Sequence, residues 1–145
     1  MGRTNNPDAT FTLRLSYGPV KGYTDASGRP IPYATTFAGL YEHATGKDPY
    51  RLPADWVQAK AELDPATPFD FVTTADTHGG NSGSPTVNER GEIVGILFDG
   101  NLEGLANRYV YTEERARSVH VAGNAIIESL KEVYHAGGLL GELGF

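Results

Sequence analysis

The chain has 145 residues, 39% of them hydrophobic and 10% aromatic, which is enough for one domain with a modest core. Its formal net charge is −6 and its 12 Lys and Arg residues are scattered, so a basic phosphate-binding surface is excluded and no nucleic-acid partner is expected. With 0 cysteines it has no disulfide, no thiolate metal site and no cysteine nucleophile.

The first half of the chain is predicted to form strands over 10–17 and 20–23, and short helices over 35–42 and 53–63. Apolar and polar residues alternate over the first strand, and Gly18 and Pro19 provide its turn. A threonine is expected to cap the first helix. Pro53 suits the start of the second helix, and Pro65 prevents its continuation.

The second half is predicted to consist of strands over 69–74, 85–88, 92–98, 109–112 and 118–121, and a closing helix over 124–134. Ile126, Leu130 and Val133 have the spacing of one helical face. The 18 glycines and 9 prolines favour turns over long helices. No apolar run could span a bilayer and the first residues lack the parts of a signal peptide, so no membrane partner is expected. The expected fold class is mainly β, with short helices and a C-terminal helix.

The densest chemical signal is the loop Thr77-His78-Gly79-Gly80-Asn81-Ser82-Gly83-Ser84-Pro85. Glycines let such a loop turn with positive φ and bring N–H groups close to a bound carbonyl, so the loop can expose a hydroxyl and build an oxyanion hole. The same residue types are common in turns, so an ordinary polar loop is the alternative interpretation. An α/β-hydrolase elbow fits less well, because Ser84 stands where glycine is expected and a strand follows. A Walker loop fits worse, because no Gly-Lys-Ser/Thr is present.

Residues 80–85 resemble the Gly-Asp-Ser-Gly-Gly-Pro signature of chymotrypsin-like serine peptidases. This match assigns Ser82 as the catalytic nucleophile, and the N–H groups of Gly80 and Ser82 as the oxyanion hole. Asn81 replaces the aspartate that pairs with a newly cut N-terminus in zymogen-activated relatives. The resemblance therefore implies that no such activation step is used.

A wider resemblance, to the S46 peptidases, covers almost the whole chain through residues 7–18, 79–85, 91–101 and 118–121 with the helix that follows. These are dipeptidyl aminopeptidases of the dipeptidyl-peptidase 7 and 11 type, similar to a two-barrel chymotrypsin fold with an inserted helical domain. The resemblance implies that residues 1–145 are the C-terminal β-barrel lobe, without the first barrel and the helical domain. It also implies a periplasmic location, a peptide substrate with a free N-terminus and a homodimer of the full-length protein.

Two substrate-binding residues follow from this resemblance. Asp99 matches the family aspartate that binds the substrate's α-ammonium group, and a carboxylate at a fixed distance from the nucleophile would measure out a dipeptide. An ordinary aspartate at a strand end is the alternative. Gly100 matches the position that sets the first specificity pocket, where glycine accompanies cleavage after bulky apolar residues and arginine accompanies cleavage after acidic ones. A hydrophobic residue before the scissile bond (P1) is therefore expected. Ala122 departs from the acidic residue that the family more often has after Val121.

The resemblance places the catalytic histidine and aspartate outside this chain. His43, His120 and His135 have no partner carboxylate indicated by the sequence and are interpreted as surface or capping residues, and His78 as a loop residue that tunes the site. No ligand spacing indicates a metal, and no cofactor is expected. The function predicted is a serine-type dipeptidyl aminopeptidase lobe whose isolated fragment is inactive. The alternatives are a non-catalytic peptide-binding or structural fragment and, more weakly, an α/β-hydrolase-like esterase.

Overall fold

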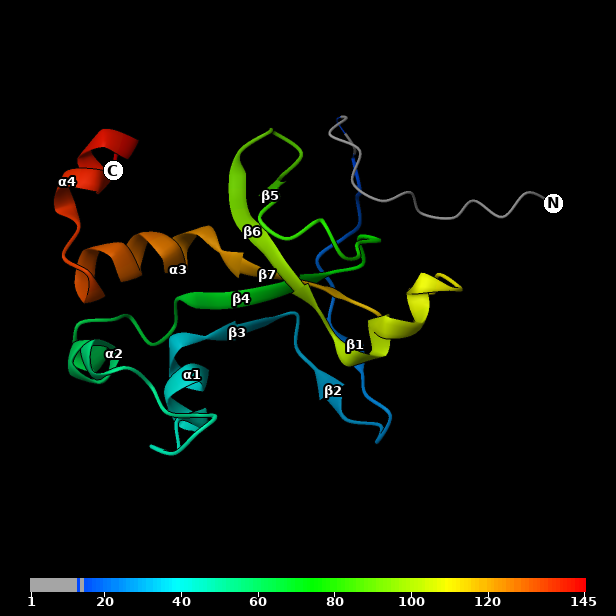
Figure 1. Ribbon diagram of the computed structural model, residues 1–145, viewed down its shortest axis with the longest axis horizontal. Coiled ribbons are helices and arrows are strands. Elements are labelled where there is room, and N and C mark those ends of the chain that lie inside the picture. Colours follow the sequence, from blue (N-terminus) through cyan, green and yellow to red (C-terminus); the bar gives the residue numbers. More distant parts are fainter. Residues whose placement is uncertain (1–12, 14) are drawn as a thin grey trace.

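The computed structural model describes residues 13 and 15–145, apart from the side chain of residue 108 (Figure 1). Its centre is an antiparallel sheet with the strand order β3-β4-β7-β6-β5. The strands are β3 (Ala34–Thr36), β4 (Pro68–Thr73), β5 (Pro85–Val87), β6 (Ile93–Gly100) and β7 (Ser118–Ala122). A separate pair consists of β1 (Tyr23–Thr24) and β2 (Pro30–Ile31). The prediction of a mainly β fold with antiparallel strands is confirmed.

The predicted C-terminal β-barrel is not confirmed, because the described residues form an open sheet. β3 and β5 each have a neighbour on one side only, so the five-stranded sheet is open at both edges. Closure requires every strand to pair on both sides. Most of the strand predicted over 10–17 lies outside the described residues, and residues 15–19 form no strand. Next to them, Val20 makes an isolated antiparallel bridge to Thr73.

The sheet has an inner face that is buried and an outer face that is partly exposed. Burial alternates along β4, β6 and β7, as expected when one face of a strand packs on a core. Phe71, His120 and Leu97 pair across the three strands and define the inner face. Gly95 lies on the same face, where a Cβ atom would stand 2.6 Å from the Phe71 ring and 2.5 Å from a backbone oxygen. A glycine is therefore required at position 95, where β6 passes the Phe71 ring.

The helices gather at one end of the molecule, whereas β1, β2 and the segment around 102–110 lie at the other (Figure 1). Phe37 is fully buried and anchors this helical end. Around it, Trp56 and Phe69 lie with ring centroids 5.5–6.2 Å apart, and Tyr134 lies 6.4 Å from Trp56. The helices are α1 (Phe37–His43), α2 (Ala54–Gln58), α3 (Gly123–Glu128) and α4 (Gly137–Leu143).

The helices confirm most of the predictions made from the sequence. The Thr36 side chain accepts a hydrogen bond from the Gly39 N–H at 3.5 Å and caps α1. α2 continues into a 3₁₀ turn, Ala59–Ala61, and α3 into a π-helical turn, Ser129–Val133. α4 was not predicted. In the described part of the chain, no helix is long and apolar enough to cross a membrane.

The strand predicted over 109–112 is wrong. A 3₁₀ helix, Leu102–Arg108, occupies the preceding residues, and the chain from 109 to 117 forms no strand. Asn101 caps the 3₁₀ helix, since its side chain accepts a hydrogen bond from the Gly104 N–H at 3.1 Å. The Tyr111 hydroxyl donates to the Thr74 carbonyl at 2.8 Å. These side-chain hydrogen bonds hold the segment out of the sheet.

Candidate active site

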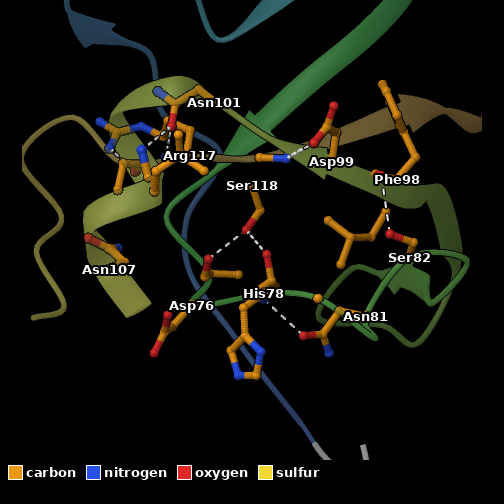
Figure 2. Close-up of a pocket in the computed structure, with 18 of the residues that line it drawn as sticks. Asp76, His78, Asn81, Ser82, Phe98, Asp99, Asn101, Asn107, Arg117 and Ser118 are labelled. Atoms are coloured by element: carbon orange, nitrogen blue, oxygen red, sulfur yellow. Dashed lines mark hydrogen bonds between the residues drawn. The ribbon is translucent and has the colours of Figure 1, made fainter. Parts of the chain in front are cut away.

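Ser82 lies in the loop between β4 and β5, between two glycines with positive φ, Gly80 (φ 100°) and Gly83 (φ 89°). The loop is aligned with β6 by the Gly83 N–H, which donates to the Leu97 carbonyl at 2.7 Å. The Leu97 N–H donates back to the Ser84 carbonyl at 3.0 Å. Ser82 is exposed, and its hydroxyl donates to the Phe98 carbonyl at 3.2 Å (Figure 2).

The loop is closed by Asn81 and leaves two backbone donors available. The Asn81 side chain accepts from the His78 N–H at 3.1 Å, and the Asn81 N–H donates to the His78 carbonyl at 3.1 Å. By contrast, the N–H groups of Gly80 and Ser82 donate to no acceptor among the described residues. Two such donors beside one hydroxyl are what an oxyanion hole requires. The assignment of Gly80 and Ser82 to that role stays a prediction.

Asp99 and Gly100 line the same cavity of about 200 Å³ as Ser82 (Figure 2). Asp99 lies near the end of β6 and accepts a hydrogen bond from the Gly100 N–H at 2.8 Å. A Cβ atom at Gly100 would meet only the Arg117 carbonyl oxygen, at 3.6 Å, so this position has room for a side chain. The structure thus brings Ser82, Asp99 and Gly100 to one cavity, while Gly80 lies two residues before Ser82 in the same loop and does not line the cavity. The roles of all four residues stay predictions. Asp76 lines the opposite side of the cavity.

Three residues that the sequence reasoning missed hold this cavity. Asn101 is the first, and it clamps two segments to each other. Its Oδ1 accepts from the N–H groups of Gly104 at 3.1 Å and Arg117 at 2.8 Å, and its Nδ2 donates to the Arg115 carbonyl at 2.7 Å. The residue directly follows Gly100, so this clamp fixes the backbone that carries Asp99. A capping asparagine ahead of a helix is a signal that the sequence did contain.

Arg117 is buried with 4% exposure, although arginine side chains mostly lie at the surface. Its guanidinium donates to the backbone carbonyls of Lys21, Gly22, Glu113 and Ala116 at 2.7–2.9 Å. These bonds engage the groups that would otherwise bind an anion. Arg117 therefore ties the start of β7 to the β1 segment.

Ser118 forms the floor of the cavity (Figure 2). Its hydroxyl donates to the Ala75 carbonyl at 2.7 Å and is also hydrogen-bonded to the Thr77 hydroxyl. Ser118 is buried, with 3% exposure. Ser118 thus holds the segment that follows β4 and leads into the Ser82 loop, a contact between distant segments for which no local sequence signal exists.

No histidine among the described residues is hydrogen-bonded to the Ser82 hydroxyl. The prediction that His120 is a surface or capping residue is wrong. His120 is buried on the inner face and stacks on Phe71, with ring centroids 4.8 Å apart. Its Nε2 lies 3.0 Å from the Thr73 hydroxyl and its Nδ1 lies 2.7 Å from that of Thr86. Burial lowers the pKa of His120 to about 4, so the ring is neutral at pH 7.

Of the other histidines, His43 and His135 do not line the cavity of Ser82, whereas His78 does. His43 is exposed in the last turn of α1, where its Nδ1 lies 3.0 Å from the Gly39 carbonyl oxygen, in line with its interpretation as a surface or capping residue. His135 follows the π-helical turn with φ 50°. His78 lines the cavity, and its ring has no hydrogen-bond partner among the described residues. Within the same residues, no cluster of His, Asp and Glu side chains could hold a metal ion.

An exposed serine between positive-φ glycines, above a cavity that contains a carboxylate, has the elements of a serine-hydrolase site. The chain belongs to the peptidase S46 family, whose sequence profile matches residues 1–145. It is 32% identical to an Asp/Glu-specific dipeptidyl-peptidase of Shewanella putrefaciens, over 94% of this chain and 23% of that protein. It is 39% identical to a dipeptidyl-peptidase 7 of Phocaeicola vulgatus, over 79% of this chain and 17% of that protein.

The fold is similar to that of a solved S46 relative. The crystal structure of Porphyromonas endodontalis DPP11 in complex with the dipeptide Arg-Glu matches with a TM-score of 0.85 and 27% identity, over 92% of this chain and 20% of that one. A DPP11 complex with the dipeptide Arg-Asp gives a TM-score of 0.81. The chain thus spans less than a quarter of the length of these relatives. The predicted resemblance to the S46 peptidases is confirmed.

Proposed function

We propose that the chain is the nucleophile-bearing lobe of a serine-type dipeptidyl aminopeptidase and works as part of a longer S46 polypeptide. The observation that carries this proposal is the cavity shared by Ser82 and Asp99. The hydroxyl of Ser82 contacts the carbonyl of Phe98, the residue just before Asp99, so the nucleophile and the carboxylate are held by one strand end. The longer polypeptide is further proposed to be periplasmic and homodimeric, as the family resemblance implies.

In the proposed reaction, the Ser82 Oγ attacks the carbonyl carbon of the scissile peptide bond and gives its proton to a base. The oxyanion of the tetrahedral intermediate would accept hydrogen bonds from the N–H groups of Gly80 and Ser82. The C–N bond then breaks, the amine leaves with the proton, and a dipeptidyl ester on Ser82 remains. Water hydrolyses this ester and releases the dipeptide. Because no described histidine contacts Ser82, the base is proposed to lie outside residues 1–145.

Asp99 is proposed to set the length of the product. A peptide with a free N-terminus carries an ammonium group, and a carboxylate at the cavity wall can bind it through charge-assisted hydrogen bonds. With the ammonium at Asp99 and the scissile carbonyl at Ser82, the spacing of the two groups would select the peptide bond that is cut, and we propose that this is the bond after the second residue. This geometry favours dipeptide release over single-residue release.

The proposed P1 preference is hydrophobic. Gly100 leaves space without charge, the cavity wall carries the carboxylates of Asp76 and Asp99, and the Arg117 guanidinium is engaged by backbone carbonyls. An acidic side chain would therefore lose hydration without gaining a cation. Relatives that are Asp/Glu-specific and relatives that are dipeptidyl-peptidase 7 match this chain at similar identity, so overall similarity does not decide the preference.

The test uses the longer polypeptide and paired dipeptidyl substrates with hydrophobic or acidic P1 residues. We expect blocking of the substrate's N-terminus, or the substitution Asp99→Ala, to reduce kcat/KM strongly for both substrate types. Gly100→Arg should raise kcat/KM for the acidic substrate and lower it for the hydrophobic one, because it adds a cation at a position with room for it. Equal cleavage of blocked and free substrates would contradict the role of Asp99.

A second candidate function is a non-catalytic peptide-binding or structural fragment. The observation in its favour is that no base contacts Ser82 within the described residues. The purified chain of residues 1–145 should show no dipeptide release under either hypothesis. The activity of the longer polypeptide decides between them. If this lobe is catalytic, Ser82→Ala should abolish dipeptide release, and if it is not, the substitution should leave dipeptide release unchanged.

A further inference from the structure

The outer face of the sheet is aliphatic although it is not buried by the described residues. In an antiparallel sheet with one solvated face, the solvated face is normally polar and the packed face apolar. Here the inner face combines the apolar side chains of Phe71 and Leu97 with buried polar groups, which are satisfied by hydrogen bonds. His120 is bonded to Thr73 and Thr86, and Ser118 is bonded to the Ala75 carbonyl. The outer face, which we define as Asp70 with the aliphatic residues that share its side of the sheet, carries Val72, Val94, Ile96, Val119 and Val121.

The register of the strands establishes this outer face. Asp70 pairs with Val121, and Val121 pairs with Ile96, so these three side chains form one row on one side of the sheet. Val72 pairs with Val119 in the next row. All five residues are exposed or half-exposed, and Ile96 keeps 37% of its surface accessible. A continuous aliphatic surface of this kind marks an interaction site.

Asp70 is the charged residue within the aliphatic rows of the outer face, and the only other acidic residue that the register of the described strands puts on this side is Asp99, opposite Val119 at the edge of the cavity. No hydrogen bond or ion pair joins its carboxylate to a described residue, and the strand neighbours that face it, Thr35 on β3 and Val121 on β7, are not ionisable. Burial raises the pKa of Asp70 to about 6, with no compensating charge. A half-buried, unpaired carboxylate inside an aliphatic surface is destabilising by itself. A cation from a covering segment would remove this cost.

We propose that the outer face is a docking surface for a segment of the longer S46 polypeptide, one that presents aliphatic side chains to the valines and a Lys or Arg side chain to Asp70. The S46 relatives supply the length for such a segment, since the matched region is only 17–23% of each of them. A second copy of this chain is a poorer occupant. The outer face has no cation of its own, so two copies facing one another would bury two carboxylates together.

This inference rests on the longer polypeptide proposed above, but not on the chemistry of Ser82. Its test therefore measures accessibility and stability rather than hydrolysis. The chain has 0 cysteines, so Ile96→Cys introduces a unique thiol within it, with Val57→Cys, 58% exposed on α2, as the matched control. In the longer polypeptide we expect a thiol reagent to label position 96 about tenfold or more slowly than position 57, because docking must open before labelling.

The second measurement compares Asp70→Asn with the wild type in the longer polypeptide by thermal unfolding between pH 3.5 and 7. A carboxylate paired with a cation has a folded pKa below its unfolded value, so its stabilisation is present above that value and lost in acid. The Tm advantage of wild type over Asp70→Asn should therefore grow as pH rises. If no cation docks, Asp70 keeps a folded pKa above its unfolded value, and the advantage should shrink as pH rises. Glu89→Gln, in the exposed β5–β6 turn, is the control for charge removal.

Each outcome bears on the proposal. Equal labelling at positions 96 and 57 would show an open face and overturn it. Slow labelling with a Tm advantage that shrinks as pH rises would show a covering segment without a cation, which also overturns it. Slow labelling of the isolated chain that depends on its concentration would assign the face to a second copy. Slow labelling only in the longer polypeptide, with an advantage that grows with pH, supports it.

Discussion

The helical end of the molecule, around Phe37, is packed from apolar side chains, whereas the end that holds Ser82 is tied by polar side chains to backbone groups. At the helical end, aromatic rings fill the space between α1, α2 and the sheet. At the other end, Asn101, Arg117 and Ser118 reach across from different segments and leave a cavity open between them. One end therefore supplies stability by burial, and the other holds an accessible site in a fixed shape.

The largest expected effect is on activity alone and comes from the end that holds Ser82. Ser82→Ala in the longer polypeptide should reduce kcat for dipeptide release by about 10⁴–10⁶-fold, the range found when a catalytic serine is removed. Because Ser82 is exposed, its removal should change the free energy of unfolding by less than about 0.5 kcal/mol. Steady-state kinetics with denaturant unfolding checks both values. Retained activity would show that the cavity is not the active site.

The reverse experiment acts on the helical end. Phe37→Ala should lower the free energy of unfolding by about 3–5 kcal/mol, since Phe37 has 0% exposure and its loss leaves a cavity next to Trp56 and Phe69. Tyr50→Ala, at 59% exposure, is the matched aromatic control and should change it by about 0.5 kcal/mol or less. Urea unfolding followed by Trp56 fluorescence measures both. Similar effects at the two positions would contradict the packing described for this end.

The same contrast explains what the sequence could predict. The helical end follows from local patterns: the Thr36 cap, the prolines around α2 and the apolar spacing of Ile126, Leu130 and Val133. A sharp loop around Ser82 was also predictable, because its glycines allow the positive φ angles that the structure shows at Gly80 and Gly83. Clamps by Arg117 and Ser118 were not, since each joins segments tens of residues apart.

Two further features could not be predicted because they depend on hydrogen bonds between distant residues. Charged side chains are usually solvated, so nothing in the sequence indicates that Arg117 is buried, but the carbonyls of Lys21 and Gly22 satisfy its guanidinium in the interior. Likewise, the residues over 109–112 have strand propensity, but the Asn101 cap and the Tyr111 hydroxyl bond hold them outside the sheet. Tertiary hydrogen bonds therefore overrode local propensity in both places.

His120 lies between the two ends and should give the chain an acid-sensitive stability. Its folded pKa of about 4 is below the ordinary value near 6.5, so the unfolded state binds the proton more readily. Stability should be full above pH 6.5 and fall as pH decreases towards 4, by up to about tenfold in the unfolding equilibrium constant per pH unit. His120→Gln should flatten this dependence in urea unfolding curves.

The control for this pH experiment is Asp70→Asn in the isolated chain. The folded pKa of Asp70 is raised to about 6, so Asp70 opposes His120 by favouring the folded state at lower pH. Removing Asp70 should therefore steepen the acid-induced loss that His120 causes. An unchanged pH profile in His120→Gln would show that the ring is not held neutral by its buried contacts with Thr73 and Thr86.

The smallest expected effect concerns Asn101, which we expect to act as a positioning residue at the polar end. Asn101→Ala removes the acceptor of the Arg117 and Gly104 N–H groups and loosens the backbone that carries Asp99. In the longer polypeptide, KM for free N-terminal substrates should rise about tenfold while kcat changes less, because ammonium binding is shared by the ground state and the transition state. Asn124→Ala, exposed at the start of α3, is the control.

A double-mutant cycle distinguishes this positioning role from a general loss of structure. If Asn101 acts through Asp99, then Asn101→Ala should have little further effect on KM once Asp99→Ala is present, because the group that it positions is gone. If Asn101 instead supports the whole cavity, the two effects should multiply, and kcat should fall together with stability. The Asn101 clamp bonds backbone groups on both sides of the cavity. A multiplicative result would therefore mean that the polar end, like the helical end, mainly stabilises the fold and does not position a single group.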